Sequence, residues 1–590
     1  MVLRIGSPFT AALFSGTVAS TSDVPGRWPC ALNGFPYLLD DQQVREHLEQ
    51  TIPALRQQFG SGDEPGDRTL NPEGAWRRAT SSWHHGAGQT HRDGDSATDR
   101  FRFRSSKGVD PWTRGALTLL ADTTQAHAPV NAIPRALMVA SQGYVYYADG
   151  NSVYRTDGTT KTIVSGTPAA ACTGLATLGA SVYAAFGASG SYKITGTTGS
   201  AFVGATAVSG IGVAKQRILA WDTNSLYDES AGAGTLVYQR TVDTSFVWAA
   251  VADGTSFIYA AGNSSTTGFI YRITVTNDAA SLGAPVIAGR VPDGEQITSL
   301  FGYAGLIFIG TTLGYRVAAE TSTGDLVVGP LVELGQAVYA WAARGQYVWF
   351  GWTNLDASST GVGRIDPTVL NDNGTYAYSS DLMVTGQGAV EGIAFLGSTM
   401  LVGVDALGVY KPATTTVASG TIDLGIVTFD LAEAKLLIGG SVSSIGVGTA
   451  TMSVSVDDNA FETIDSSGFN QTGAYFEARV TLTAAAGVSP TVRTTVLRAF
   501  PQQQNTRVLI APLLIANPLH LPETGVESSF DIAAGLNNVR DLWSSRRVTT
   551  YQEGNDTWSV TVEDYEFRKT DPAESADWQG TCVVKMKVVQ

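Results

Sequence analysis

The densest set of potential metal ligands in the sequence lies in one short glycine-rich segment. The ligands are, in order, His84, His85, His91, Asp93, Asp95 and Asp99. Their spacing matches neither the HExxH pattern of a zinc-binding helix nor a Cys/His zinc motif. It also lacks the glycine and glutamate positions of a calcium loop. We therefore expect no metal site, and we interpret the segment as a loop that hydrogen-bonds to a neighbouring surface.

Three carboxylates lie at the ends of predicted strands, beside turns: Asp149, Asp222 and Asp405. A glycosidase needs two carboxylates, about 5 Å apart for retention or about 6.5–9.5 Å apart for inversion. Turn carboxylates usually accept backbone hydrogen bonds instead. No GxSxG elbow, phosphate-binding loop or dinucleotide-binding motif is present. We expect no catalytic residue, no cofactor-binding residue and no cofactor.

Aromatic side chains are the remaining candidates for ligand binding. Five tryptophans belong to the central part of the chain: Trp221, Trp248, Trp341, Trp349 and Trp352. A tryptophan can stack on a sugar ring or anchor an interface, and Trp352 lies beside an unusually long predicted turn. Packing between sheets is the favoured interpretation for each of them, so none is assigned to a site.

The cysteines follow no disulfide or metal pattern. Cys30, Cys172 and Cys582 are widely separated in a chain of 590 residues. A secreted protein held together by disulfides would show more cysteines, in an even number. We expect three buried, reduced thiols, which is compatible with folding in a reducing cytoplasm.

The charge balance excludes several classes of partner. The net charge is −15, and residues 1–120 contain equal numbers of cationic and anionic side chains, so the acidic excess lies in the rest of the chain. An acidic body repels nucleic acid and anionic membranes. No apolar run approaches the ~20 residues that span a bilayer, and the first residues make a weak signal peptide. We expect no nucleic-acid binding, no membrane insertion and no secretion signal.

A repeat of two turns and two apolar strands dominates the middle of the chain. Seven units begin at Gly143, Gly179, Lys215, Gly254, Gly305, Gly345 and Gly397. Most are preceded by another short apolar stretch, which gives sheets of three or four strands at a spacing of about 40 residues. This pattern predicts a seven-bladed β-propeller. The apolar runs Val145–Ala148, Phe257–Ala261 and Leu306–Ile309 do not alternate strictly, as expected of strands buried on both sides.

The ring of a propeller must be closed, commonly by one sheet that takes strands from both ends of the repeat region. The candidates for closure are residues 115–123 before the first unit and residues 414–425 after the last. A straight β-solenoid is the structural alternative, but it would show shorter and more regular periods.

The flanking segments differ from the repeat. Residues 1–115 contain one helical candidate, Val44–Phe59, and otherwise loop-like sequence, which indicates an extended N-terminal arm that docks on another surface. Residues 116–417 form the propeller. Residues 418–501 alternate with period 2 and predict a small β-sandwich. Residues 502–590 contain strands and a helix at Gly535–Arg546, which predicts an α+β domain. The fold class is therefore mainly β.

Several stretches together resemble minor tail proteins of long-tailed bacteriophages that infect actinobacteria. They are residues 31–40 (ALNGFPYLLD), residues 82–120, Thr550-YQEG, Glu566-FRK and residues 578–587 (WQGTCVVKMK). The resemblance extends over the whole chain, but none of these motifs is highly specific. It implies an N-terminal arm, a propeller and C-terminal accessory domains assembled at the tail tip.

We therefore expect a non-enzymatic structural protein of the virion, located at the tail tip and assembled in the host cytoplasm. The arm would dock through arginines that meet acidic partners: Arg77, Arg78, Arg100, Arg102 and Arg104. The partners would be other tail-tip proteins and copies of the chain itself in a trimer or hexamer, with host cell-wall glycan as a further ligand. The alternatives are a propeller glycan hydrolase or depolymerase, and a lectin-like carbohydrate-binding protein outside a virion.

Overall fold

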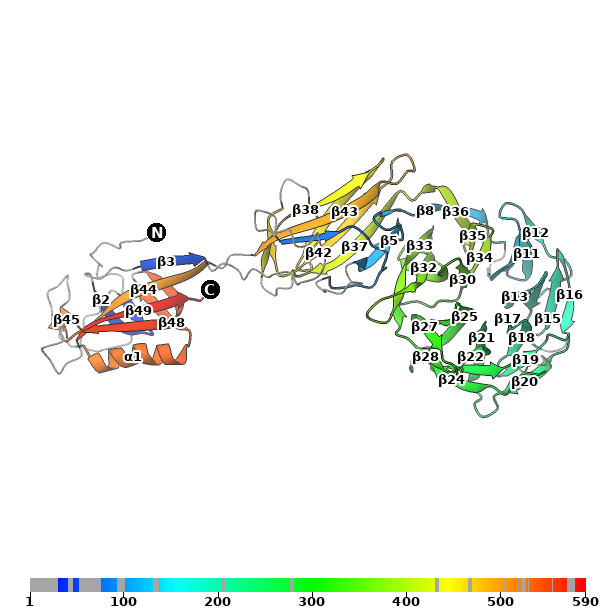
Figure 1. Ribbon diagram of the computed structural model, residues 1–590, viewed down its shortest axis with the longest axis horizontal. Helices are drawn as coiled ribbons and strands as arrows, with labels where there is room; N and C mark the ends of the chain where they lie inside the picture. The colour runs from blue at the N-terminus through cyan, green and yellow to red at the C-terminus, as the bar shows by residue number, and fades with distance from the viewer. Residues whose placement is uncertain are drawn as a thin grey trace. The chain divides into compact units, whose positions relative to one another are not determined.

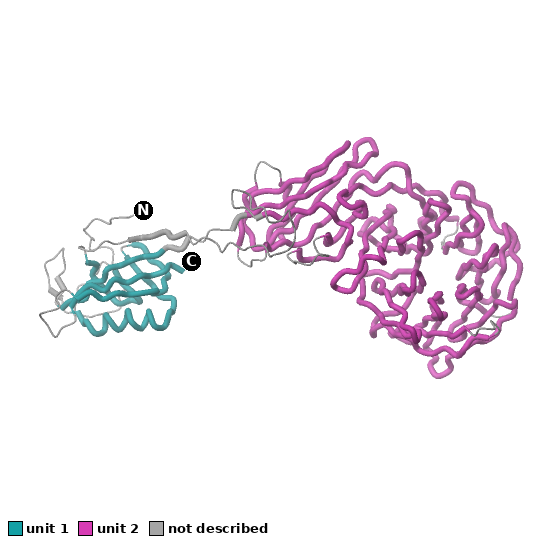
Figure 2. Tube along the Cα trace, in the orientation of Figure 1, with its two compact units in different colours: residues 1–58, 501–590 teal, residues 59–500 magenta. Residues whose placement is uncertain are grey.

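The computed structural model describes residues 30–40, 46–51, 76–92, 101–130, 137–203, 207–275, 281–429, 434–464, 469–501, 505–517, 519–520, 527–528, 530–553, 555–569 and 579–589. The described chain is mainly β, with one α-helix. It divides into two compact units (Figure 2). Unit 1 comprises residues 1–58 and 501–590, and unit 2 comprises residues 59–500.

Unit 2 contains a β-propeller built from antiparallel sheets that follow one another along the chain (Figure 1). Among the described residues there are seven such sheets. The first four consist of β9 (Met138–Ser141), β10 (Tyr144–Asp149), β11 (Ser152–Thr156) and β12 (Lys161–Ile163); β13 (Gly174–Leu178), β14 (Ser181–Ala185), β15 (Ser191–Thr195) and β16 (Thr198–Val203); β17 (Gly210–Ala214), β18 (Arg217–Asp222), β19 (Ser225–Asp228) and β20 (Thr235–Gln239); and β21 (Phe246–Asp253), β22 (Phe257–Ser264), β23 (Thr267–Thr274) and β24 (Val286–Arg290).

The remaining three sheets complete the series. They consist of β25 (Ile297–Tyr303), β26 (Leu306–Thr311), β27 (Gly314–Glu320) and β28 (Leu326–Val328), with β29 (Val332–Glu333) beside β27; β30 (Trp341–Arg344), β31 (Tyr347–Asp356), β32 (Ser359–Leu370) and β33 (Tyr376–Thr385); and β34 (Val390–Leu396), β35 (Thr399–Val404), β36 (Gly408–Thr416) and β8 (Ala121–His127).

The second strand of each sheet is apolar on both faces. In β22, Ile258 and Ala260 pack toward the preceding sheet, whereas Tyr259 and Ala261 pack toward the following one. The same division occurs in β10, where Val145 and its alternate neighbours pack against the last sheet of the series. Burying a large apolar side chain contributes about 1.5–3 kcal/mol, so each sheet is stabilised by having a neighbour on both sides. The apolar runs are therefore buried on both faces, as predicted.

The closure prediction was right on one side and wrong on the other. Strand β8, from the N-terminal candidate, pairs with β36 and forms the outermost strand of the last sheet. Of the C-terminal candidate, only residues 414–416 belong to the last sheet, as the end of β36. The rest contributes to β37 (Ser419–Val427), which pairs with β42 (Phe476–Thr483) outside the propeller, while β8 takes the position beside β36.

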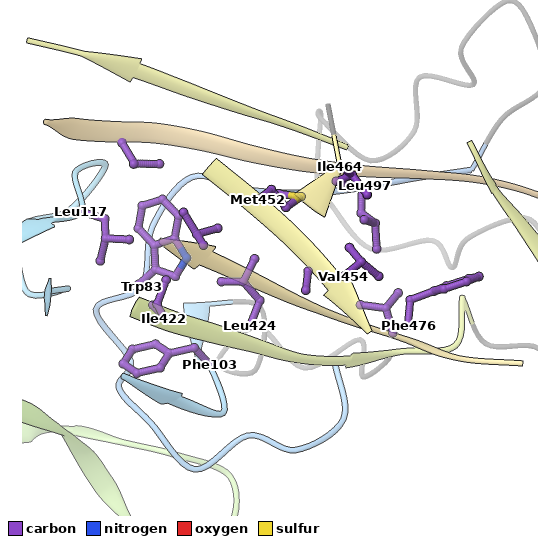
Figure 3. Close-up of a cluster of buried hydrophobic side chains, with 14 of the residues drawn as sticks. Trp83, Phe103, Leu117, Ile422, Leu424, Met452, Val454, Ile464, Phe476 and Leu497 are labelled. Atoms are coloured by element: carbon purple, nitrogen blue, oxygen red, sulfur yellow. The ribbon is translucent and has the colours of Figure 1, made fainter. Parts of the chain in front are cut away.

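Two further sheets of unit 2 enclose a core of their own. One contains β40 (Glu462–Ile464), β39 (Thr449–Val456), β42, β37 and β5 (Ser105–Lys107); the other contains β4 (Trp76–Thr80), β43 (Thr491–Pro501), β38 (Lys435–Ile445) and β41 (Gln471–Gly473); a short pair, β6 (Val109–Asp110) and β7 (Thr118–Leu119), lies beside them in the chain. Figure 3 shows Trp83, Ile422 and Met452 within this core. Met452, Val454 and Val456 are buried on alternate positions of β39, as the period-2 pattern predicts.

Unit 1 joins the two ends of the chain in one sheet. Its elements are β1 (Cys30–Leu32), β2 (Phe35–Leu39), β3 (Glu46–Thr51), β44 (Asn505–Ile515), α1 (Ile532–Ser545), β47 (Thr549–Glu553), β48 (Asp556–Lys569) and β49 (Gly580–Val588), with the short pair β45 (Leu519–His520) and β46 (Glu527–Ser528). The sheet order is β2-β1-β47-β48-β49-β44-β3, and β2 also pairs with β44. The helix is N-capped by the Asp531 side chain and ends at Arg546 in a left-handed conformation, close to the predicted bounds.

The expected N-terminal arm is wrong for the described part of residues 1–115. Strands β1, β2 and β3 belong to the sheet of unit 1, β4 and β5 to the two facing sheets of unit 2. The predicted helix Val44–Phe59 is also wrong where it is described, because β3 pairs along its whole length with β44. Both errors have the same cause: these segments gain their backbone partners from residues several hundred positions away. Residues 44–45 and 52–59 of that predicted helix lie outside the described residues.

The three cysteines are buried and free, as predicted. Burial raises the pKa of the Cys582 thiol to about 12, so this thiol stays protonated and unreactive at neutral pH. In the described residues no helix is long and apolar enough to cross a membrane.

The segment after β4 contacts the propeller through a close backbone approach at Gly86. The Ala87 amide donates a 2.7 Å hydrogen bond to the Tyr378 carbonyl oxygen in β33. Gly86 has φ +81°, and a Cβ atom there would lie 2.5 Å from the Tyr378 nitrogen and 2.6 Å from its oxygen. Only glycine leaves room for the two backbones to meet.

We predict that Gly86→Ala loosens this contact. Gly143→Ala is the matched control, because Gly143 has φ +75° and a Cβ there meets nothing within 4 Å. Both variants carry the left-handed strain of about 1–2 kcal/mol, but only Gly86→Ala adds an overpacking cost of about 1–3 kcal/mol. Hydrogen exchange should therefore accelerate at residues 83–92 in Gly86→Ala alone. Equal exchange in the two variants would contradict the steric argument.

Candidate functional site

The candidate site is a cavity of about 610 Å³ in the propeller. It is lined by the first strand of every sheet in the series and by the residues just before those strands: β9, β13, β17, β21, β25, β30 and β34. A volume of this size is typical of small-molecule sites, which are about 300–1,000 Å³. The second strands are buried between neighbouring sheets on both faces. The first strands therefore line the cavity.

Small residues bring the first strands close together. A Cβ atom on Gly210 would lie 2.4 Å from the Trp221 ring, and one on Gly212 would lie 2.3 Å from the Val251 side chain. On Gly174 it would lie 3.0 Å from the Ile211 backbone nitrogen. Gly210 makes room for the Trp221 ring of its own sheet, whereas Gly174 and Gly212 let neighbouring sheets approach at the cavity.

The serine and threonine hydroxyls that line the cavity all donate their protons to other protein groups. Ser209 donates to Asp222 Oδ1 at 2.9 Å, and Ser299 donates to the Val338 carbonyl at 2.7 Å. The other three donate to backbone carbonyls: Thr173, Thr177 and Thr298. What these hydroxyls present to the cavity is therefore oxygen lone pairs rather than protons.

Tyr339 and Glu391 supply the exposed aromatic ring and the charge. Tyr339 precedes β30 and is 42% exposed, and Glu391 lies in β34 of the next sheet. Burial and, next, the charge of Glu391 raise the pKa of Tyr339, so the phenol stays protonated at neutral pH. Among the described lining residues, Glu391 is the single charged side chain. Sequence reasoning missed both; the available signal was their place at the start of a first strand.

The five tryptophans divide between cavity walls and sheet packing. Trp221, Trp248 and Trp341 line the cavity, but Trp221 is 8% exposed and Trp248 2% exposed, so neither offers a ring face for stacking. Trp341 donates from Nε1 to Ser299 Oγ at 2.9 Å. Trp349 donates to Asp381 Oδ2 at 2.6 Å, and Trp352 stacks on Phe350 with ring centroids 5.7 Å apart. Neither of these two lines the cavity.

The three carboxylates singled out in the sequence do not meet. Asp149 is buried and accepts a 2.7 Å hydrogen bond from the Val130 amide. Asp222 accepts from Ser209. Asp149, Asp222 and Asp405 are all described, and none of them is among the cavity lining residues.

The histidine segment packs as a structural loop in the part that is described. The rings of His84 and His85 lie 4.5 Å apart and both contact Phe101. Burial and then the charge of His85 lower the pKa of His84 to about 4, so this imidazole is neutral at pH 7. In the described residues no group of three or more His, Cys, Asp or Glu side chains could hold a metal. Asp93, Asp95 and Asp99 lie outside those residues.

The arginines proposed for docking make contacts within the chain where they are described. Arg104 forms a 2.7 Å ion pair with Glu477 of β42. Arg102 is buried and donates to the Gln89 side chain at 2.7 Å. Arg77 and Arg78 lie in β4, which pairs with β43. Arg100 lies outside the described residues. Arg102 and Arg104 therefore make contacts within unit 2, and the role of these arginines in docking stays a prediction.

No protein-family model and no curated protein matches the chain. Among solved structures, a virginiamycin B lyase from Staphylococcus aureus shares 16% identity at a TM-score of 0.39, covering 49% of this chain and 98% of that one. YCF48 from Cyanidioschyzon merolae shares 14% identity at a TM-score of 0.36, covering 50% and 98%. The computationally designed Ika8 protein shares 11% identity at a TM-score of 0.35, covering 52% and 96%. At these values the similarity carries no argument about activity, ligand or partners.

One buried carboxylate has no hydrogen-bond partner in the described structure. Glu229, directly after β19, is fully buried, and neither of its side-chain oxygens is hydrogen-bonded. Burial raises the pKa of Glu229; the nearby Ser191 hydroxyl opposes this, and the charge of Asp228 adds to it. Burial therefore disfavours the charged form of this carboxyl.

We predict that Glu229 makes the propeller less stable as the pH rises. Between the ordinary Glu pKa of 4.5 and the raised folded-state pKa, the unfolded chain is ionised while the folded chain keeps its proton. Folding then requires proton uptake, so the free energy of unfolding falls with increasing pH. The Glu229→Gln variant should lack this decline in pH-dependent denaturation curves, whereas exposed Glu333→Gln should keep it. Parallel curves for wild type and Glu229→Gln would refute the assignment.

Proposed function

We propose that the protein is a structural component of a bacteriophage tail tip, a minor tail protein, whose propeller contacts glycans of the host cell surface. The observation that carries the proposal is the path of the chain. Both ends of the chain are woven into the sheet of unit 1, and everything between residues 59 and 500 is inserted into it. One unit built from both flanking segments, with a second unit inserted between them, suits a protein that docks through one unit and binds a ligand through the other.

We propose further that the seven sheets form one closed seven-bladed propeller over residues 116–417. The support is that seven separate apolar clusters each join two consecutive sheets, including the last and the first. The two facing sheets then form a β-sandwich of residues 418–501 completed by strands from residues 76–107, and unit 1 is an α+β domain of both chain ends.

Unit 1 takes over the docking role that the sequence suggested for an arm. It carries partly exposed apolar groups on and beside its helix: Trp543 is 37% exposed and Val548 57% exposed. Tail components repeat around the axis of the tail, so the proposed partners are other tail-tip proteins and further copies of this chain in a trimer or hexamer.

The cavity favours binding over hydrolysis. Glycoside hydrolysis needs a pair of carboxylates, and the described lining residues supply Glu391 alone. Acceptor oxygens and one exposed aromatic ring instead provide contacts for a hydroxyl-rich ligand. The proposed protein is therefore a structural and binding component without an enzymatic step.

The test is whether the chain is part of the particle. Mass spectrometry of virions purified through two density gradients should find the protein at a constant ratio to the major tail protein, and antibodies raised against unit 2 should label one end of the tail. An abundant lysate protein serves as the contamination control and should disappear in the second gradient. Loss of this chain together with the control would contradict a virion role and favour a free carbohydrate-binding protein.

A further inference from the structure

His127 lies where the last sheet of the propeller series meets the first, and it is the single histidine of residues 116–417. It ends β8, the outermost strand of the last sheet, and is 7% exposed. Its Nε2 atom lies 2.6 Å from Oγ1 of Thr156 in β11 of the first sheet. Its ring stacks on Tyr147 of β10, with ring centroids 6.0 Å apart. One side chain therefore joins the two sheets by a hydrogen bond and a ring contact, which we call the closing contact.

We propose that the closing contact is acid-sensitive: protonation of His127 separates the last sheet from the first, so that the propeller opens between β8 and β11 in mildly acidic solution. The inference goes beyond the tail-tip role and does not depend on it. It rests on the position of this one imidazole between two sheets and on the charges that surround it.

The first argument is the direction of the hydrogen bond. The Gly158 amide donates to Thr156 Oγ1 at 2.9 Å, and Thr156 is 1% exposed. The hydroxyl proton of a buried threonine needs an acceptor of its own, and Nε2 of a neutral imidazole supplies one. A protonated imidazole carries a hydrogen on both nitrogens and accepts nothing. Protonation of His127 therefore removes the acceptor of the Thr156 hydroxyl.

The second argument is the pair of lysines that cross between the same two sheets. Lys411 in β36 donates to the Gly158 carbonyl oxygen at 2.9 Å, and Lys161 in β12 donates to the Ala128 carbonyl oxygen at 3.2 Å. Both charges are thereby held near His127. Burial, followed by the charges of Lys161 and Lys411, lowers the pKa of His127. A protonated His127 would be a third cation at this contact, and repulsion among the three favours separation.

The remaining polar groups around the closing contact do not offset that repulsion. Asp157 raises the pKa of His127, but it is the last of the four causes. Its carboxylate is exposed and accepts hydrogen bonds from two backbone amides of its own turn. Burial raises the pKa of Tyr147, so this phenol stays uncharged below neutral pH.

The sign of the pH effect follows from linkage. In the opened form His127 titrates with its ordinary pKa of 6.5, whereas the closed form has a lowered pKa. As the pH falls below 6.5, the opened form takes up a proton that the closed form does not bind, so acid favours opening. Between pH 7.5 and pH 5 the ratio of opened to closed molecules rises by at most about 30-fold, the limit for a ring that stays neutral while closed.

The experiment places a reactive thiol beneath the closing contact of the full-length chain. Val409 lies opposite His127 in the register of β36 and β8, is 1% exposed and packs between the last and first sheets. The thiol of Val409→Cys therefore reacts with dithiodipyridine when the two sheets separate. Its labelling rate is measured at pH 7.5 and pH 5 and divided by the rate of glutathione in the same buffer, which removes the effect of pH on the reagent and the thiol. Peptide mass spectrometry separates this label from the three buried native cysteines.

We expect the corrected labelling rate of Val409→Cys to rise by about five- to 30-fold at pH 5. Adding His127→Gln should abolish the rise, because glutamine keeps an acceptor oxygen for the Thr156 hydroxyl and does not titrate. Adding His84→Gln should leave the rise intact, although the pKa of His84 is also lowered, because that imidazole contacts Phe101 and not the closing contact.

A matched control distinguishes local opening from general loosening by acid. Val362 is 0% exposed in β32 and packs between the sixth and seventh sheets, so Val362→Cys should show no acid-dependent rise. If Val409→Cys does not fold, Val145→Cys reports the same opening from the first sheet. The proposal is overturned by an unchanged corrected rate at pH 5, by an equal rise in Val362→Cys, or by a rise that persists with His127→Gln.

Discussion

The architecture of unit 2 depends on covering sheets that are apolar on both faces. In β10, β22 and β26 successive side chains alternate between two different clusters, so no face of these strands is suited to water. A sheet of this kind is stable only between two neighbours, and a linear stack would leave its two terminal sheets exposed. Cyclic packing removes those ends. The cavity follows from the same constraint. The first strands surround the axis of the propeller and leave space between them.

The closing strand ties the propeller to the rest of unit 2. Strand β8 completes the last sheet, and the chain just before it provides β5, β6 and β7, so one continuous segment runs from the two facing sheets into the propeller edge. Side chains reinforce this path. Arg364 of β32 lies within 3.3 Å of Asp110 and 3.0 Å of the buried Asp381, and it covers the Trp112 ring. If the segment with Asp110 and Trp112 separated from the propeller, Arg364 would keep Asp381 but lose the Asp110 carboxylate and the Trp112 ring. Losing partners of a largely buried ion pair is unfavourable, so this junction resists opening.

The features that could be predicted from the sequence are those determined by residues close together in the chain. The repeat units, the period-2 strand β39 and the helix α1 follow from turns, alternation and caps within a few residues, and these predictions match the described elements. Strand β3 was mistaken for a helix because its pairing partner β44 lies more than 450 residues away. Tyr339 and Glu391 were missed because the sequence marks where a first strand begins but not which of its side chains line the cavity. Burial of Trp221 and Trp248 was the expected outcome, and it explains why tryptophan content alone did not locate the site.

The placement of both chain ends in unit 1 has a consequence for the order of folding. The sheet of unit 1 combines β1 and β2 with β44, β47, β48 and β49, so it can form only after β49 has been synthesised. Contacts of such long sequence separation carry a large loop-closure cost, which falls when the intervening chain has already become compact. The six propeller sheets from β9 to β33 consist of strands that follow one another in the chain, so this part of unit 2 can fold as its repeats emerge. Early folding of unit 2 therefore brings the two ends within reach, and unit 1 closes last.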